Sequence, residues 1–261
     1  MTRFLHRFSL SFYSLIILIS IVVLTYFGLS FYRLPIEERF FDPNYELLKP
    51  SGILGHGLGI IGTLFIVIGL FGYMARKRLK IFSRIGVLKY WLEFHIFLCT
   101  LGSIFVLFHT SFKFGGIVSI GFWSMVIVWT SGLVGRFIYL QIPRTIEGRE
   151  LSLKEAQEMK ADLNLELMIK YNIDISEIKA SKFFQIKLKL LARNISTKDY
   201  KKIKRLIKKQ RKITNRIARL DKMQHLFIYW HVVHLPFALI MLIIMVIHVA
   251  VVLTLGYKWI F

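Results

Sequence analysis

Four of the eight histidines in this 261-residue chain form two matched pairs, His95 with His109 and His234 with His248. Both pairs have the same spacing, and each lies within a strongly apolar stretch. In an α-helix, this interval of about 14 residues returns to within about 40° of the same face and advances about 21 Å along the axis. Because histidine in hydrocarbon is costly unless it has a partner, this spacing predicts imidazole chemistry at two depths of a membrane.

Two imidazoles that face each other at one depth can coordinate a single metal from opposite sides. This arrangement suits a haem lying between two helices, whereas zinc takes about four ligands in a tetrahedral set. The single cysteine, Cys99, excludes a four-thiolate iron–sulfur site, and the lack of a Cys-x-x-Cys-His motif excludes covalently attached haem. We therefore expect two non-covalent b-type haems, with His95, His109, His234 and His248 as metal ligands.

One ligand has an alternative. His231 lies three residues before His234, close to the same helix face. The 17-residue step from His231 to His248 turns the ring about 100° away, so His234 is preferred. Pro236 follows closely and can kink this helix.

Several glycines repeat the spacing of the histidines. Glycine permits the close backbone approach that a haem edge requires between helices. Two glycine pairs have the same interval as the histidine pairs, and a further glycine lies midway between His95 and His109. We expect these five residues to line the haem sites: Gly55, Gly69, Gly102, Gly121 and Gly135.

Other polar residues near the helix ends are weaker candidates. His56, beside Gly55, is a candidate to bind a quinol or a haem propionate, or else caps its helix and faces water. Arg136 is a candidate to hold a propionate, since a planar guanidinium suits carboxylates, or else anchors its helix at the interface. We expect Glu93 to pair with Lys89 or Arg136.

The elements that must position these residues are apolar helices. Hydrophobic residues make up 55% of the chain and charged residues 20%, which excludes a disordered chain and an ordinary soluble enzyme. A membrane-spanning helix takes roughly 20 apolar residues. Five stretches qualify: Phe8–Phe31, Ser51–Ala75, Tyr90–Phe112, Phe114–Gly135 and Leu226–Tyr257. We predict an all-α membrane protein with five transmembrane helices, of which the last four form the haem-binding bundle.

Charge predicts the orientation and the division of the chain. The segment between residues 141 and 225 holds 22 basic and 10 acidic residues, and the link between the second and third helices is basic without an acid. By the positive-inside rule, the N-terminus is inside and the C-terminus outside a bacterial inner membrane. We expect an N-terminal anchor at 1–32, three bundle helices at 51–140, a basic cytoplasmic arm at 141–225 and a fifth helix at 226–257.

The basic arm is expected to be helical. Ser152 and Glu155 form a capping box, and a second helix is expected to run from 201 into the last membrane helix. Its apolar face consists of Ile203, Leu206, Ile207, Ile213, Ile217 and Leu220. The excess positive charge is mainly a topology signal; docking of an acidic partner or of anionic membrane lipid is the alternative, and no nucleic-acid partner is expected.

The paired histidines and glycines together resemble the diheme four-helix core of the cytochrome b family. That family places histidine pairs of this spacing on its second and fourth core helices and glycine pairs on its first and third. The resemblance implies electron transfer between the quinone pool, as quinone or quinol, and a redox partner subunit in a membrane complex, as part of a quinone-linked oxidoreductase. The alternatives are a haem-free scaffold or assembly subunit and a histidine-lined transporter.

Overall fold

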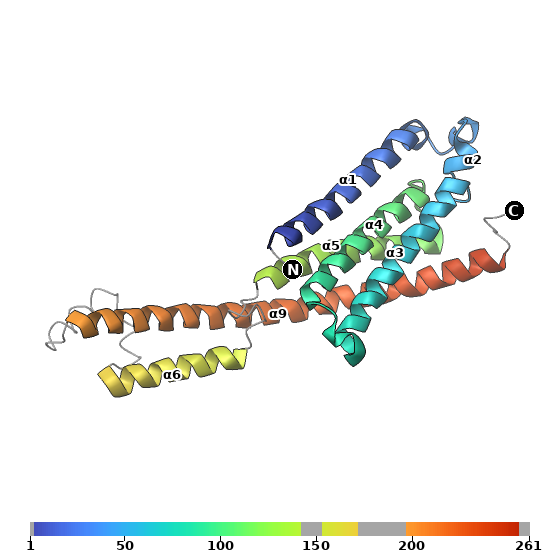
Figure 1. Cartoon of the computed structure of the whole chain (residues 1–261). Helices are drawn as coiled ribbons and strands as arrows, with labels where there is room; N and C mark the ends of the chain where they lie inside the picture. The colour runs from blue at the N-terminus through green and yellow to red at the C-terminus, as the bar shows by residue number, and fades with distance from the viewer. Residues whose placement is uncertain (1–2, 142–152, 172–196, 256–261) are drawn as a thin grey trace. The chain divides into compact units, whose positions relative to one another are not determined.

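The structure, a computed structural model, describes residues 3–141, 153–171 and 197–255 (Figure 1). This part of the chain is helical and contains no strand. Five of its helices are long and apolar enough to cross a membrane, which confirms the predicted all-α fold with five transmembrane helices. They are α1 (Arg3–Arg33), α3 (Ile53–Arg78), α4 (Leu88–His109), α5 (Gly116–Gln141) and α9 (Thr197–Thr254).

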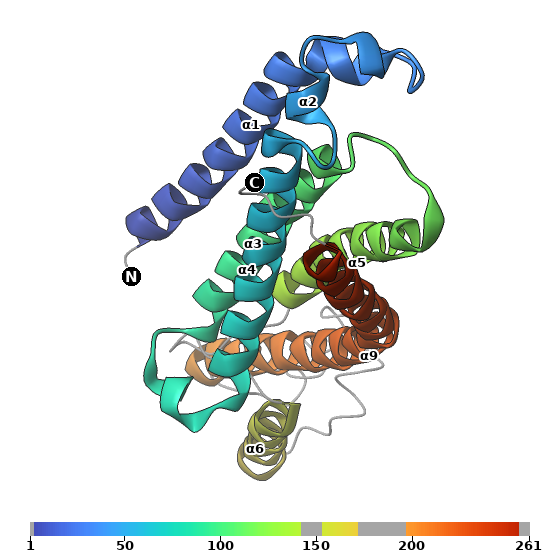
Figure 2. The same ribbon diagram turned by 90° about the vertical axis from the view of Figure 1, so that its right-hand side faces the viewer.

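The chain divides into two compact units, and the first contains the described residues up to Val134 and from Val232 onward. Two short elements, η1 (Arg39–Phe41) and α2 (Tyr45–Leu48), connect α1 to α3, and η2 (Lys80–Arg84) connects α3 to α4. Helices α3 and α4 make the most extensive contact in the unit and lie side by side in both views (Figures 1 and 2).

A small apolar cluster joins four helices of this unit. Ile66 of α3, Phe122 and Met125 of α5 and Met241 of α9 are buried together, and Val106 of α4 packs against them. Most other large apolar side chains of the spanning helices are exposed, as expected of helices whose outer faces contact lipid.

The helix ends follow the charge pattern of the sequence. Helix α3 begins after Gly52, whose backbone is extended, and its last turn holds Arg76, Lys77 and Arg78. Cations near a helix C-terminus are favourable because they oppose the negative end of the helix dipole. The same residues anchor the helix at a membrane surface, so the apolar run and the helix stop together.

The second unit comprises the described residues between Gly135 and His231. Its helix α6 (Leu153–Tyr171) packs antiparallel on the first part of α9, with Ala156 against Leu220 and the Asn164 side chain 3.5 Å from that of Gln210. The predicted apolar face of α9 is buried there at Ile203, Ile207, Ile213 and Leu220. The predicted helix start at Ser152 lies just outside the described residues, and α9 continues through Pro236 as one helix.

Candidate functional site

The predicted histidines of α4 are both anchored to the backbone of α3. The Nδ1 atom of His109 lies 2.8 Å from the carbonyl oxygen of Gly55, and the Nδ1 atom of His95 lies 2.9 Å from that of Gly69. A carbonyl can only accept, so in both rings Nδ1 carries the proton. Each Nε2 is left with its lone pair available, which is the arrangement found in metal-bound histidines.

Midway between these two contacts, the backbones of α3 and α4 approach closely at Gly62 and Gly102. A Cβ atom added to Gly62 would lie 2.8 Å from the carbonyl oxygen of Gly102, and one added to Gly102 would lie 2.6 Å from that of Gly62. Only glycine allows this approach. The predicted Gly102 therefore fixes the spacing between the two helices that carry the histidine anchors.

The structure brings together two of the predicted ligands, His109 and His248, which we call the outer pair because the predicted orientation would put them near the outer membrane surface. The ring centres of His109 and His248 lie 6.4 Å apart, with their planes inclined by 58°. Two imidazoles bound to one metal from opposite sides, with bonds of about 2.0 Å, have ring centres about 6 Å apart. Both side chains are half-buried. The separation therefore suits two axial ligands of one metal.

His56 is a second neighbour of His109 at the same ring-centre separation, 6.4 Å. The Nδ1 atom of His109 faces the α3 backbone at Gly55, so its Nε2 atom points away from the helix that carries His56. This geometry favours His248 as the partner of His109. His56 is then placed beside the pair rather than within it.

These three histidines border an apolar cavity of about 650 Å³ within the first unit. Its walls come from α3, α4, α5 and α9 and include Gly121, which was predicted to line a haem site. Ligand cavities of roughly 300–1,000 Å³ with mostly apolar walls and a few polar groups are typical of cofactor sites. The size, the lining and the paired imidazoles all fit a haem.

The other two predicted ligands, His95 and His234, which we call the inner pair, contact different helices: His95 contacts α3 and His234 contacts α5. His95 is bound to α3, and the Tyr73 ring lies 5.4 Å from its ring centre. His234 of α9 places its Nδ1 atom 2.8 Å from the hydroxyl oxygen of Ser131 in α5. Its Cε1 atom lies 3.9 Å from the position of a Cβ atom on Gly132. Both imidazoles thus have an oriented Nδ1 atom, as a metal-bound histidine requires.

The alternative ligand His231 has a different environment. Its Nδ1 atom lies 2.8 Å from the carbonyl oxygen of Phe227, one turn earlier in its own helix. Its ring also packs edge-on against Phe227 and Trp230. His234 reaches across to another helix, whereas His231 bonds within α9.

The remaining predicted glycines occupy several environments. A Cβ atom on Gly69 would lie 3.2 Å from Cys99 Sγ, and one on Gly121 would lie 2.7 Å from Ile244 of α9. Gly55 is buried at the start of α3 against the carbonyl of Lys49. In the second unit, a side chain on Gly135 would collide with the Trp230 indole, and Arg136 is half-buried.

Sequence reasoning missed Gly59, which faces the His109 ring. A Cβ atom added there would lie 2.8 Å from His109 Nδ1. Gly59 is about one helical turn from Gly55 along α3. The sequence does show a glycine one turn after the predicted Gly55. However, Gly59 has no partner glycine at the interval that the histidines share, so the spacing argument did not select it.

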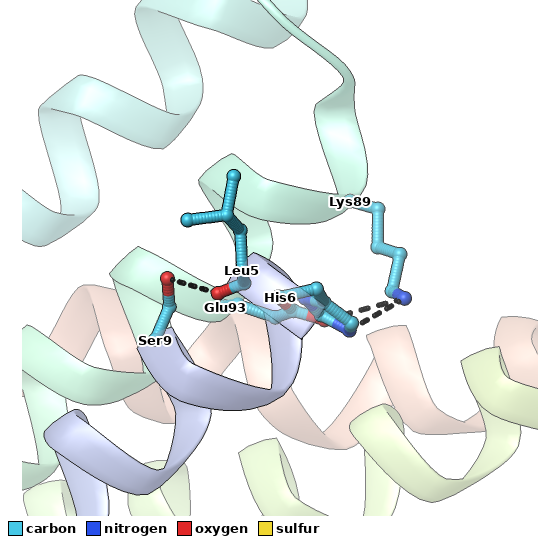
Figure 3. Close-up of polar contacts among 5 residues, drawn as sticks. All are labelled: Leu5, His6, Ser9, Lys89 and Glu93. Atoms are coloured by element: carbon cyan, nitrogen blue, oxygen red, sulfur yellow. Dashed lines mark hydrogen bonds and ion pairs between the residues drawn. The ribbon is translucent and has the colours of Figure 1, made fainter. Parts of the chain in front are cut away.

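Glu93 belongs to a polar cluster formed by the first turns of α1 and α4. Its buried carboxylate lies 3.7 Å from Lys89 Nζ, which confirms the predicted pairing, and 3.3 Å from His6 Nδ1. Lys89 Nζ is also 3.0 Å from His6 Nε2 (Figure 3). Because an ammonium can only donate, His6 Nε2 accepts from Lys89. His6, which the sequence left without a role, thereby attaches α1 to α4.

Comparisons with protein-family models, curated proteins and solved structures give no match to this chain.

Proposed function

We propose that this protein is a diheme b-type cytochrome, a membrane subunit that carries electrons across a bacterial inner membrane between the quinone pool and a partner redox protein. The observation that carries the proposal is the outer pair: His109 and His248, with ring centres 6.4 Å apart, at the wall of an apolar cavity of about 650 Å³. Such a pair, with the His109 Nδ1 atom bonded to a backbone carbonyl, is the ligand set that a haem needs.

In this proposal, His109 and His248 hold the outer haem, and His95 and His234 hold the inner one. Bound haem would supply reversible one-electron chemistry, which amino-acid side chains at these positions lack. The carbonyls of Gly55 and Gly69 and the Ser131 hydroxyl contact the Nδ1 atoms of His109, His95 and His234, which would leave Nε2 of these three rings to bind the iron. The mostly apolar lining would limit the access of water to the bound group.

The other parts of the chain have supporting roles. His56, which borders the same cavity, is the candidate contact for a quinol head group. The basic face of α9, which begins with Lys201 and Lys202 and lies opposite its buried apolar face, is a docking surface for an acidic redox partner or for anionic lipid. By the positive-inside rule, the basic segments favour an orientation with the N-terminus and the arm formed by α6 and the first part of α9 inside the cell.

A spectrum of the purified full-length chain tests the proposal. A reduced-minus-oxidised difference spectrum should show b-type bands, and a pyridine haemochrome assay should give two haems per chain. A preparation from haem-replete cells that binds no haem would contradict the proposal and favour a haem-free scaffold or a transporter.

A further inference from the structure

One charged side chain lines the outer cavity. The described residues around it are apolar except for the three histidines, two threonines and Lys113. Lys113 is the only lysine, arginine or acid among them, and it follows closely after His109 in the sequence. The lining therefore includes one positively charged side chain, that of exposed Lys113, just beyond the C-terminus of α4.

The chain makes a strained turn just before Lys113. Helix α4 ends at His109, and Ser111 and Phe112 just beyond it have positive φ angles of 48° and 59°. This left-handed conformation is uncommon for residues other than glycine and costs about 1–3 kcal/mol per residue. The turn closes with a hydrogen bond of 2.9 Å from the Lys113 amide to the Thr110 carbonyl. Such strain persists only where surrounding contacts hold it, and it concentrates at ligand sites.

Buried Arg39 supplies those contacts. Its guanidinium donates to the carbonyl oxygen of Ser111 at 2.5 Å and to the carbonyl oxygens of Tyr32 and Leu34 at 3.0 Å. The Ser111 hydroxyl donates to the carbonyl oxygen of Leu48 at 2.7 Å. The turn is thus tied to the end of α1 and to α2, so the backbone position of Lys113 is fixed relative to the cavity.

We propose that Lys113 binds a carboxylate of the outer haem, an inference that rests on the proposed function. Haem carries two propionate groups, and a carboxylate at an apolar cavity is costly unless it is paired with a cation. A charge-assisted hydrogen bond from the Lys113 ammonium provides that pairing. Lys113 then orients the haem within the cavity, with its carboxylate edge toward the end of α4, while the histidines hold the metal.

Reconstitution with two porphyrins tests this assignment. The full-length chain is produced under haem limitation and carries His234→Ala, so that only the outer site is measured. It is titrated with haem and, separately, with haem dimethyl ester, in which both carboxylates are blocked. Lys113→Gln should weaken haem binding by about tenfold or more and leave ester binding unchanged. Lys113→Arg should restore haem affinity. Lys49→Gln, which removes a lysine that does not line the cavity, should behave like the parent chain.

Two results would overturn the assignment while leaving the proposed function intact: unchanged haem affinity in Lys113→Gln, or equal losses of affinity for haem and for its ester. A parent chain that binds neither porphyrin would instead contradict the proposed function and the Lys113 assignment with it.

Discussion

His109 donates its Nδ1 proton to the carbonyl oxygen of Gly55 across 2.8 Å, from α4 to α3. The same relationship recurs between His95 and Gly69, at 2.9 Å. The step between the two histidines along α4 is therefore matched by an equal step between the two glycines along α3, in the opposite direction. The repeated pattern explains why the histidines and the glycines of these helices share one spacing.

The outer haem is expected to depend on His109 and His248 and not on His56. His109→Ala and His248→Ala should each reduce the haem content from two per chain to one, because each removes an axial ligand of one site. His56→Ala should keep both haems, since the His109 Nε2 atom faces away from α3. Pyridine haemochrome quantification measures all three. Loss of haem in His56→Ala with retention in His248→Ala would assign the ligand role to His56.

Gly59→Val should remove the outer haem selectively. An ideal Cβ atom at this position lies 2.8 Å from His109 Nδ1 and 2.9 Å from its Cε1 atom, so the ring must move. The displaced imidazole should lose both its bond to Gly55 and its ligand geometry. Haem content and the reduced spectrum of the remaining haem provide the measurement. Gly72→Val is the control, because Gly72 lies in the same helix outside the cavity and its added Cβ atom would be at an ordinary contact distance of 3.6 Å from Trp91. Normal haem content in Gly59→Val would show that the His109 position is not critical.

Ser131→Ala should weaken the inner haem. The substitution removes the 2.8 Å hydrogen bond between Ser131 Oγ and His234 Nδ1. Loss of such a supporting contact to a metal ligand typically reduces metal affinity by about 10–100-fold. Haem transfer to excess apomyoglobin should become faster for one of the two haems. Thr130→Ala is the matched control, because the Thr130 hydroxyl bonds carbonyls of its own helix, at 2.9 Å and 3.0 Å. Equal transfer rates in both variants would separate Ser131 from the haem site.

The proposed orientation is testable with single cysteines in a Cys99→Ala background. Phe41 and Ile81 are 82% and 83% exposed and lie in the two successive links between α1 and α3 and between α3 and α4. A membrane-impermeant maleimide should label Phe41→Cys in intact spheroplasts and Ile81→Cys only after permeabilisation. The reverse pattern would invert the topology.

The membrane helices could be predicted from the sequence because each of them contains a long run of apolar residues. A run of about 20 apolar residues has few alternatives in a bilayer, and basic residues at its ends mark where it stops. The histidine pairs were predicted for a similar reason, since an imidazole within an apolar helix is rare. The outer pair and the α3 anchors of His95 and His109 agree with that interpretation.

Side-chain partners could not be predicted, because they depend on helix rotation and on turns. Ser131 is one of two adjacent hydroxyl residues, and periodicity alone does not show which one faces His234. The turn at Ser111 and Phe112 lacks the glycine that would normally signal a left-handed backbone. Arg39 is buried because its guanidinium bonds to this turn. In the sequence it is only one basic residue in a polar link, and such residues are usually exposed.

The close approach of Gly62 and Gly102 locks α3 and α4 in one register, midway between the His95–Gly69 and His109–Gly55 contacts. Inserting one residue into α4 between His95 and His109 would swing one imidazole by about 100° relative to the other and lengthen their separation by about 1.5 Å. No local adjustment at either end can absorb that change while the glycine crossing stays closed. The distance between the two His–Gly contacts is therefore set by equal steps along α3 and α4, and a change of length in one helix would need a matching change in the other to keep both contacts.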